Sequence, residues 1–153
     1  NSVSLSAMII SKQNIVAAKS FSENKEVITA EDYDLWIKLA KNNTHIIFTE
    51  EPLGYYQIHN ISESSNISRN TNAIVSVIKS HLRDQKKMLN IALANCWKNS
   101  GKQFYLNCSN YESCKSYLKS LKYNFMNIKI YLLILTTLIP AEFYKYMVNK
   151  RND

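Results

Sequence analysis

Only two of the 153 residues are glycine, Gly54 and Gly101, and this scarcity narrows what the chain can fold into. Loops that hold phosphate groups bring backbone N–H groups close to the ligand, and they need several glycines at fixed spacing to do so. Neither the GxGxxG pattern of dinucleotide-binding folds nor a P-loop is present. A nucleotide, if the protein uses one, is not bound by a glycine-rich loop of this sequence.

The charge of the chain favours an anionic partner. Nineteen Lys and Arg stand against twelve Asp and Glu, which gives a formal net charge of +7. Such an excess suits nucleic acid, a phospholipid surface or a sugar nucleotide, and it also suits a solvated surface without a partner. The basic residues alternate with apolar ones on the expected helices and form no recognisable DNA or RNA module, so we expect no nucleic-acid partner.

The cysteines, Cys96, Cys108 and Cys114, are odd in number and form no CxxC pair. This usage is typical of reduced thiols in a cytosolic protein, and a bridge between Cys108 and Cys114 is the alternative. No histidine stands at a ligand-like spacing from the cysteines, so we expect no zinc site.

Residues 1–70 predict an α/β arrangement. Three short segments rich in apolar and aromatic residues are expected to be strands, at residues 3–10, 45–48 and 55–59. Between the first two we expect helices at residues 12–19 and 31–40. The sequence therefore predicts a partial sheet with a helix packed against it.

The helix at residues 31–40 has the clearest local signals. Thr29, with Asp32 three residues later, fits a capping box that satisfies the first N–H groups of the helix. Asn42 and Asn43 supply its stop.

Residues 71–153 predict a basic helical tail. Residues 60–72, rich in Ser and Asn, read as a mobile loop, and helices are expected at residues 73–99, ended by Gly101, and at residues 111–125. Residues 128–139 are nearly all apolar but shorter than the ~20 residues that a membrane span needs. This segment suits either a helix lying in the membrane interface or a buried terminal helix.

Three acids, Glu31, Asp32 and Asp34, gather in the first turn of the helix at residues 31–40, where the helix dipole stabilises the ionised carboxylate. A carboxylate that also faces a cleft can accept a proton from an attacking hydroxyl. The alternative is that Asp32 caps the helix and Asp34 is solvated. His59, at the end of an expected strand, is either a ligand contact or an ordinary surface residue.

Residues 31–40, Glu-Asp-Tyr-Asp-Leu-Trp-Ile-Lys-Leu-Ala, resemble the EDYDLWLRLA signature of bacterial family 2 glycosyltransferases. Residues 51–59, Glu-Pro-Leu-Gly-Tyr-Tyr-Gln-Ile-His, resemble the xPLxYYRxH segment that follows it in that family. The resemblance covers residues 2–68 and implies the late part of a GT-A (nucleotide-diphospho-sugar transferase-like) sheet with its catalytic helix.

The resemblance also implies residue roles. Asp32 matches the general base that deprotonates the acceptor hydroxyl, and Glu31 matches its acidic neighbour at the acceptor site, where Asp34 is also expected. Trp36 matches a packing position beneath them. His59 matches a residue that approaches the donor diphosphate or a divalent metal, Mg or Mn, in the intact enzyme.

Three departures from the family pattern are visible. Lys19, Ser20 and Ser22 surround Phe21 where the family has a Gly-Phe-Asp bend. Gln57 replaces the usual Arg, which removes a fixed cation near the phosphates. No metal-binding DxD motif and no nucleotide-binding βαβ unit precedes the signature.

We therefore expect the acceptor-side portion of an inverting glycosyltransferase, inactive and metal-free as an isolated chain. The intact enzyme would move a sugar from a nucleotide-sugar donor to a surface-glycan acceptor in the bacterial cytoplasm, with a peripheral position on the inner face of the plasma membrane as one option. The alternative is a non-catalytic peripheral membrane or protein-interaction module.

Overall fold

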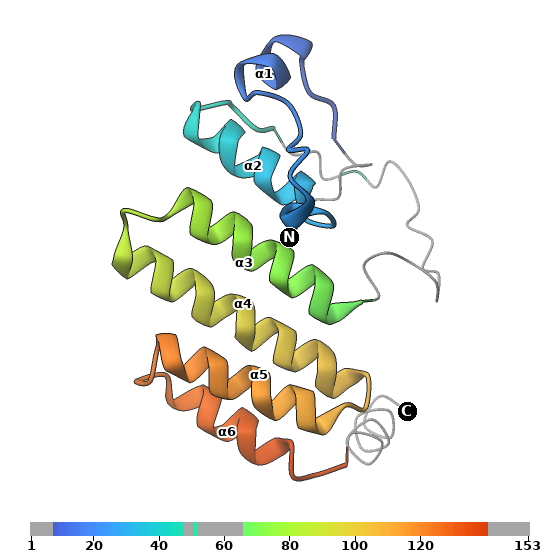
Figure 1. Ribbon diagram of the computed structural model, residues 1–153, viewed down its shortest axis with the longest axis vertical. Helices are drawn as coiled ribbons and strands as arrows, with labels where there is room; N and C mark the ends of the chain where they lie inside the picture. The colour runs from blue at the N-terminus through green and yellow to red at the C-terminus, as the bar shows by residue number, and fades with distance from the viewer. Residues whose placement is uncertain (1–7, 48–50, 52–65, 141–153) are drawn as a thin grey trace. The chain divides into compact units, whose positions relative to one another are not determined.

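The computed structural model describes residues 8–47, 51 and 66–140 (Figure 1). By its internal contacts the chain divides into two compact units, Asn1–Val77 and Ile78–Asp153. The division falls within the helix that spans residues 67–81.

The predicted α/β fold is wrong, because the described residues form helices and no strand. Residues 8–10 and 45–47, parts of two expected strands, have no regular structure, and residues 55–59 lie outside the described residues. A strand needs a neighbour for its backbone N–H and C=O groups, and the described part of the chain supplies none. Ile9 and Ile47, which a sheet would bury, are 102% and 93% exposed.

The described residues of the first unit form three short helical segments and part of a longer helix. The segments are α1 (Lys12–Ala17), the 3-10 helix η2 (Lys25–Val27) and α2 (Glu31–Lys41). The longer helix is α3 (Ile67–His81). Helices predicted at residues 12–19 and 31–40 are thus present as α1 and α2.

Helix α2 begins at Glu31 and ends before Asn42 and Asn43 as predicted, but its first turn is not capped as predicted. Asn43 adopts a left-handed φ of 52°, and Thr44 N donates to Leu39 O at 3.2 Å, which is the hydrogen bond of a Schellman stop. At the other end the N-cap is Ala30, and no side chain caps the helix. The expected capping box is therefore absent, because Thr29 lies one residue too early and has a left-handed φ of 82°.

Two small apolar clusters hold the described residues of the first unit together. One joins the segment before α2 to α3 and consists of Val27, Ala30, Ala73 and Val77. The other joins the end of α1 to α2 and consists of Ala18, Leu35 and Leu39. Helix α2 therefore contributes to a core on two sides, which fixes the position of its acidic first turn.

Helix α3 begins inside the segment predicted as a mobile loop. The side chain of Asn66 accepts a hydrogen bond from Arg69 N at 3.0 Å, as an N-cap residue does, and residues 67–72 are helical. The single helix predicted at residues 73–99 is in fact two, α3 and α4 (Lys86–Leu106), separated by a turn in which Gln85 N donates to Leu82 O. The sequence lacks a Gly or Pro at this turn, so it gave no breaking signal.

The second unit is built from α4, α5 (Asn110–Tyr123) and α6 (Ile128–Thr136), which run alternately up and down (Figure 1). The two serine side chains that face α4 fix its register with α5. Ser113 Oγ donates to Gly101 O at 2.8 Å, and Ser120 Oγ donates to Ala94 O at 2.6 Å. Both serines are fully buried, so the two helices approach closely along small residues.

Gly101 lies inside α4 and does not end it. A Cβ atom at this position would lie 2.5 Å from Cε1 and 2.6 Å from Cδ1 of Tyr117, whose side chain is buried. The glycine is therefore needed for the close approach of α4 and α5. Gly101 is thus a packing residue inside α4, although glycine often ends a helix.

Helix α6 is held against α5 through its C-terminal end. Asn110 Nδ2, at the start of α5, donates to Thr137 O at 2.8 Å and to Ile139 O at 3.0 Å.

Among the described residues, no helix has the length and apolar character that crossing a membrane requires.

Candidate functional site on helix α2

Four of the five residues singled out from the sequence lie on α2. Glu31, Asp32 and Asp34 occupy its first turn, and Trp36 follows them. His59 lies outside the described residues, so its predicted approach to a diphosphate or metal is not tested. The helix places the three acids where free backbone N–H groups and the helix dipole stabilise negative charge.

Asp34 has a structural partner. Its carboxylate is 5% exposed and pairs with Lys38 Nζ at 2.6 Å, and Lys38 also donates to Ser20 O at 3.2 Å. This arrangement ties α2 to the turn that follows α1. The i,i+4 spacing of an acid and a lysine predicts such a pair, although the sequence analysis had assigned Asp34 to the acceptor site.

Asp32 is half-buried at the start of the helix. Its Oδ1 atom accepts a hydrogen bond from Tyr33 N at 2.6 Å, a contact within the first turn. Because neighbouring positions on a helix are about 100° apart, Asp32 and Asp34 project in different directions. Asp34, which pairs with Lys38, and Asp32, which matches the general base, therefore lie on different sides of α2.

Buried polar atoms without hydrogen-bond partners occur at sequence positions close to these acids. They are Thr29 Oγ1, Glu31 Oε2 and Trp36 Nε1, each without a partner in the described part of the structure. Most buried polar groups in native proteins are paired, so unpaired ones mark strain or a missing ligand. Thr29 is also in the left-handed region at φ 82°, which a β-branched residue rarely adopts.

Trp36 packs against the cluster of Ala18, Leu35 and Leu39. The indole thus supports α2 from the side that faces α1, as a packing residue would.

The described residues contain no group of three or more His, Cys, Asp or Glu side chains able to hold a metal ion. No described residue is therefore assigned to the divalent metal that the resemblance implies.

None of the three cysteines forms a disulfide, so the alternative bridge between Cys108 and Cys114 is absent. Burial raises the pKa of the Cys96 thiol to about 11. A thiol that keeps its proton at neutral pH is a weak nucleophile, so Cys96 is suited to packing within α4 and not to catalysis.

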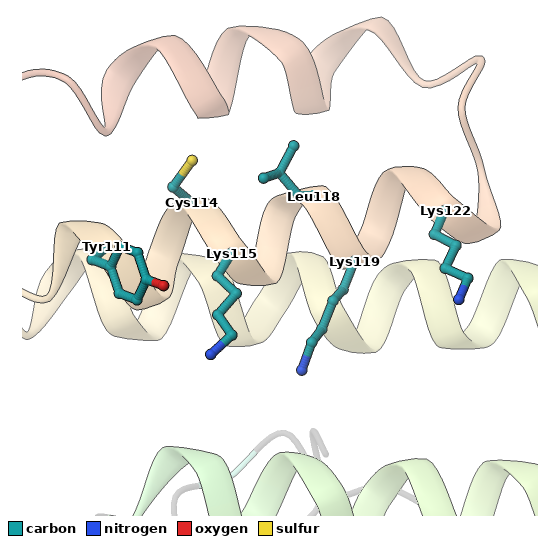
Figure 2. A pocket seen from close by; sticks show the side chains of 6 residues that line it. All are labelled: Tyr111, Cys114, Lys115, Leu118, Lys119 and Lys122. Carbon is teal, nitrogen blue, oxygen red and sulfur yellow. The ribbon is translucent and has the colours of Figure 1, made fainter.

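A separate open groove of about 410 Å³ lies along α5 in the second unit. Its lining is a mixture of apolar and basic side chains, Tyr111, Cys114, Lys115, Leu118, Lys119 and Lys122 (Figure 2). Lys119 Nζ stands 4.0 Å from the centre of the Trp97 ring, and Lys115 Nζ lies 3.7 Å from a carboxylate oxygen of Glu112. The groove contains none of the residues that the sequence analysis proposed as a site.

No protein-family model, curated protein or solved structure matches this chain. The resemblance of residues 31–40 and 51–59 to family 2 glycosyltransferases therefore stays a prediction.

Proposed function

We propose that α2 carries the acceptor-side acid of an inverting sugar transferase, with Asp32 as the general base. The observation that carries the proposal is the first turn of α2, where two acids of one sequence motif have different surroundings. The ion pair with Lys38 balances the charge of Asp34, and Asp32 projects from a different side of the helix. A motif with two acids in separate environments suits one structural and one chemical role.

The chemistry assigned to Asp32 is a proton transfer. Its carboxylate accepts the proton of an acceptor hydroxyl while the hydroxyl oxygen attacks the anomeric carbon of the donor. The new C–O bond forms as the bond from that carbon to the leaving phosphate oxygen breaks, and the nucleoside diphosphate departs. Displacement in line from the opposite face inverts the anomeric configuration.

The proposal assigns no described residue to the donor nucleotide, because the sequence has no glycine-rich loop. It also requires no sheet among the described residues.

The test compares variants of the full gene product in an assay of acceptor-dependent nucleoside diphosphate release. Donors are UDP-, GDP- and dTDP-sugars, and acceptors are oligosaccharides from the surface glycan of the source cells. Asp32→Asn keeps the size of the side chain and an oxygen for the Tyr33 N–H. Removal of a general base lowers kcat by roughly 10²- to 10⁴-fold.

The matched control is Glu26→Gln, which removes one negative charge from an exposed position in the same unit. We expect this variant to keep activity within about twofold of wild type, since exposed substitutions away from a site have small effects. Equal activity of Asp32→Asn and wild type would refute the assignment. So would the absence of acceptor-dependent release by wild type with every donor.

A further inference from the structure

Helix α6 presents an exposed apolar stripe. The stripe, which we call the α6 stripe, consists of Ile128, Tyr131, Leu132, Leu135 and Leu138, the last in the turn after the helix. Their side chains are 74%, 46%, 60%, 59% and 79% exposed. The spacing of three and four residues places them on one side of the helix.

The opposite side of α6 is the one that packs. Ile130 and Thr137 are 1% and 7% exposed, and α6 contacts α5. Phe125 and Met126, in the connection that leads into α6, are 72% and 80% exposed as well. The helix is therefore neither a fully buried terminal helix nor an ordinary amphipathic one, since its outward side is the apolar one.

The same unit carries the positive charge of the chain. Residues 78–140 contain ten Lys and Arg against two acids, Asp84 and Glu112, which gives a formal net charge of +8. The other residues of the chain together have a formal net charge of −1. Lys129 borders the α6 stripe in sequence, and Lys115, Lys119 and Lys122 line the groove on the neighbouring helix α5 (Figure 2).

We propose that the second unit docks on an anionic lipid surface, with the α6 stripe inserted at the boundary between headgroups and acyl chains. An apolar helix face on a unit with a net positive charge matches both parts of such a surface. Negative headgroups attract the lysines, and the acyl region takes up the apolar side chains. This inference goes beyond the proposed sugar transfer and does not depend on it.

Charge favours this occupant over two others. A second copy of the chain would bring together two segments 78–140, each with a formal charge of +8, which opposes pairing through the α6 stripe. A nucleic acid would satisfy the lysines but leave the apolar stripe in water, since phosphate contacts are electrostatic. The lipid surface alone accounts for the lysines and the stripe together.

The test is co-sedimentation of the full chain with two kinds of vesicle, phosphatidylcholine alone and two parts phosphatidylcholine to one part phosphatidylglycerol. We expect binding to the anionic vesicles that is at least tenfold stronger than to the neutral ones, because each lysine near the surface contributes roughly a fivefold factor. Binding should weaken as salt is raised.

The stripe is tested with Leu132→Glu/Leu135→Glu. Both side chains are more than half exposed, so the substitutions leave the packing of α6 intact. The matched control is Ile9→Glu/Ile47→Glu, which adds the same charge at two exposed apolar positions of the first unit. We expect the stripe variant to bind anionic vesicles at least tenfold more weakly than the control, because it lacks two inserted apolar side chains.

A second readout locates the insertion. Tyr131→Trp adds an indole in the stripe to Trp36 and Trp97, and brominated lipids should quench the emission of this variant more strongly than that of the wild-type chain. Equal binding by the stripe variant and its control would overturn the proposal. Retention of RNA or DNA with no vesicle binding, or a wild-type dimer that the stripe variant makes monomeric, would overturn it as well.

Discussion

Replacing Gly101 by alanine tests the close packing of α4 and α5. The new Cβ atom would stand 2.5 Å and 2.6 Å from two ring atoms of Tyr117. The ring cannot swing away easily, because Tyr117 is 1% exposed and lies at the centre of the interface. The helices must separate, which strains the buried bond from Ser113 Oγ to Gly101 O.

Two opposing effects set the magnitude. Overpacking of a buried site costs about 1–3 kcal/mol, and contacts this short with a buried ring lie toward the upper end. Alanine is a better helix former than glycine by about 1 kcal/mol, which offsets part of that cost. We therefore expect Gly101→Ala to lower the free energy of unfolding by about 1–2 kcal/mol.

The assay is urea denaturation followed by circular dichroism at the helical band. Tyr117→Ala and the double variant complete a cycle, in which Gly101→Ala should become harmless or stabilising once the ring is gone. Lys102→Ala, at the exposed neighbouring position, is the control for helix propensity. A gain in stability from Gly101→Ala in the presence of Tyr117 would refute the packing of α4 against α5.

Two further predictions concern single side chains. Lys38→Met leaves the buried Asp34 carboxylate without its ion-pair partner, so we expect a loss of about 2–4 kcal/mol in chemical denaturation, against little change for the exposed Lys12→Met. Burial raises the pKa of the Cys96 thiol from 9.0 to about 11. As the pH rises, this thiol therefore loses its proton in the unfolded chain before it does so in the folded chain. The stability that Cys96 contributes should therefore be complete below pH 9, and the free energy of unfolding should fall by about 1 kcal/mol near pH 10. Unfolding curves measured across this pH range test the prediction, and Cys96→Ala should abolish the fall.

The helices that the sequence predicted well are those with local signals. Asn42 and Asn43 end α2 through a left-handed residue and a Schellman hydrogen bond, which depends on few neighbours. The helix at residues 110–123 was found by apolar periodicity and the helix at residues 128–136 as an apolar run, each within three residues of its expected limits. Both signals lie within the helix itself.

The misses depended on contacts with distant residues. An apolar segment such as residues 45–47 becomes a strand only beside another strand, so its composition alone was insufficient. Gly101 was interpreted as a helix stop because nothing near it in sequence reveals the ring of Tyr117. The apolar spacing from Leu82 to Leu89 continues across the turn between α3 and α4, which hid the break.

The candidate site was predicted in part. The sequence placed Glu31, Asp32 and Asp34 in one helical turn, and the structure has them there. It did not separate the two aspartates. The i,i+4 spacing of Asp34 and Lys38 indicates their ion pair, but the burial of Asp34 in the first unit does not follow from that spacing. The exposure of the α6 stripe was also beyond the sequence, which left a membrane-interface helix and a buried helix as alternatives.

The measurement that tests the central functional claim most directly is chemical rescue of Asp32→Ala. Acceptor-dependent release of nucleoside diphosphate by this variant is measured with and without formate, a small carboxylate able to take the place of the missing side chain. If Asp32 is the general base, the variant is nearly inactive and formate restores a concentration-dependent part of the rate. Full activity without formate, or a loss that formate does not relieve while Asp32→Glu is also inactive, would contradict the claim.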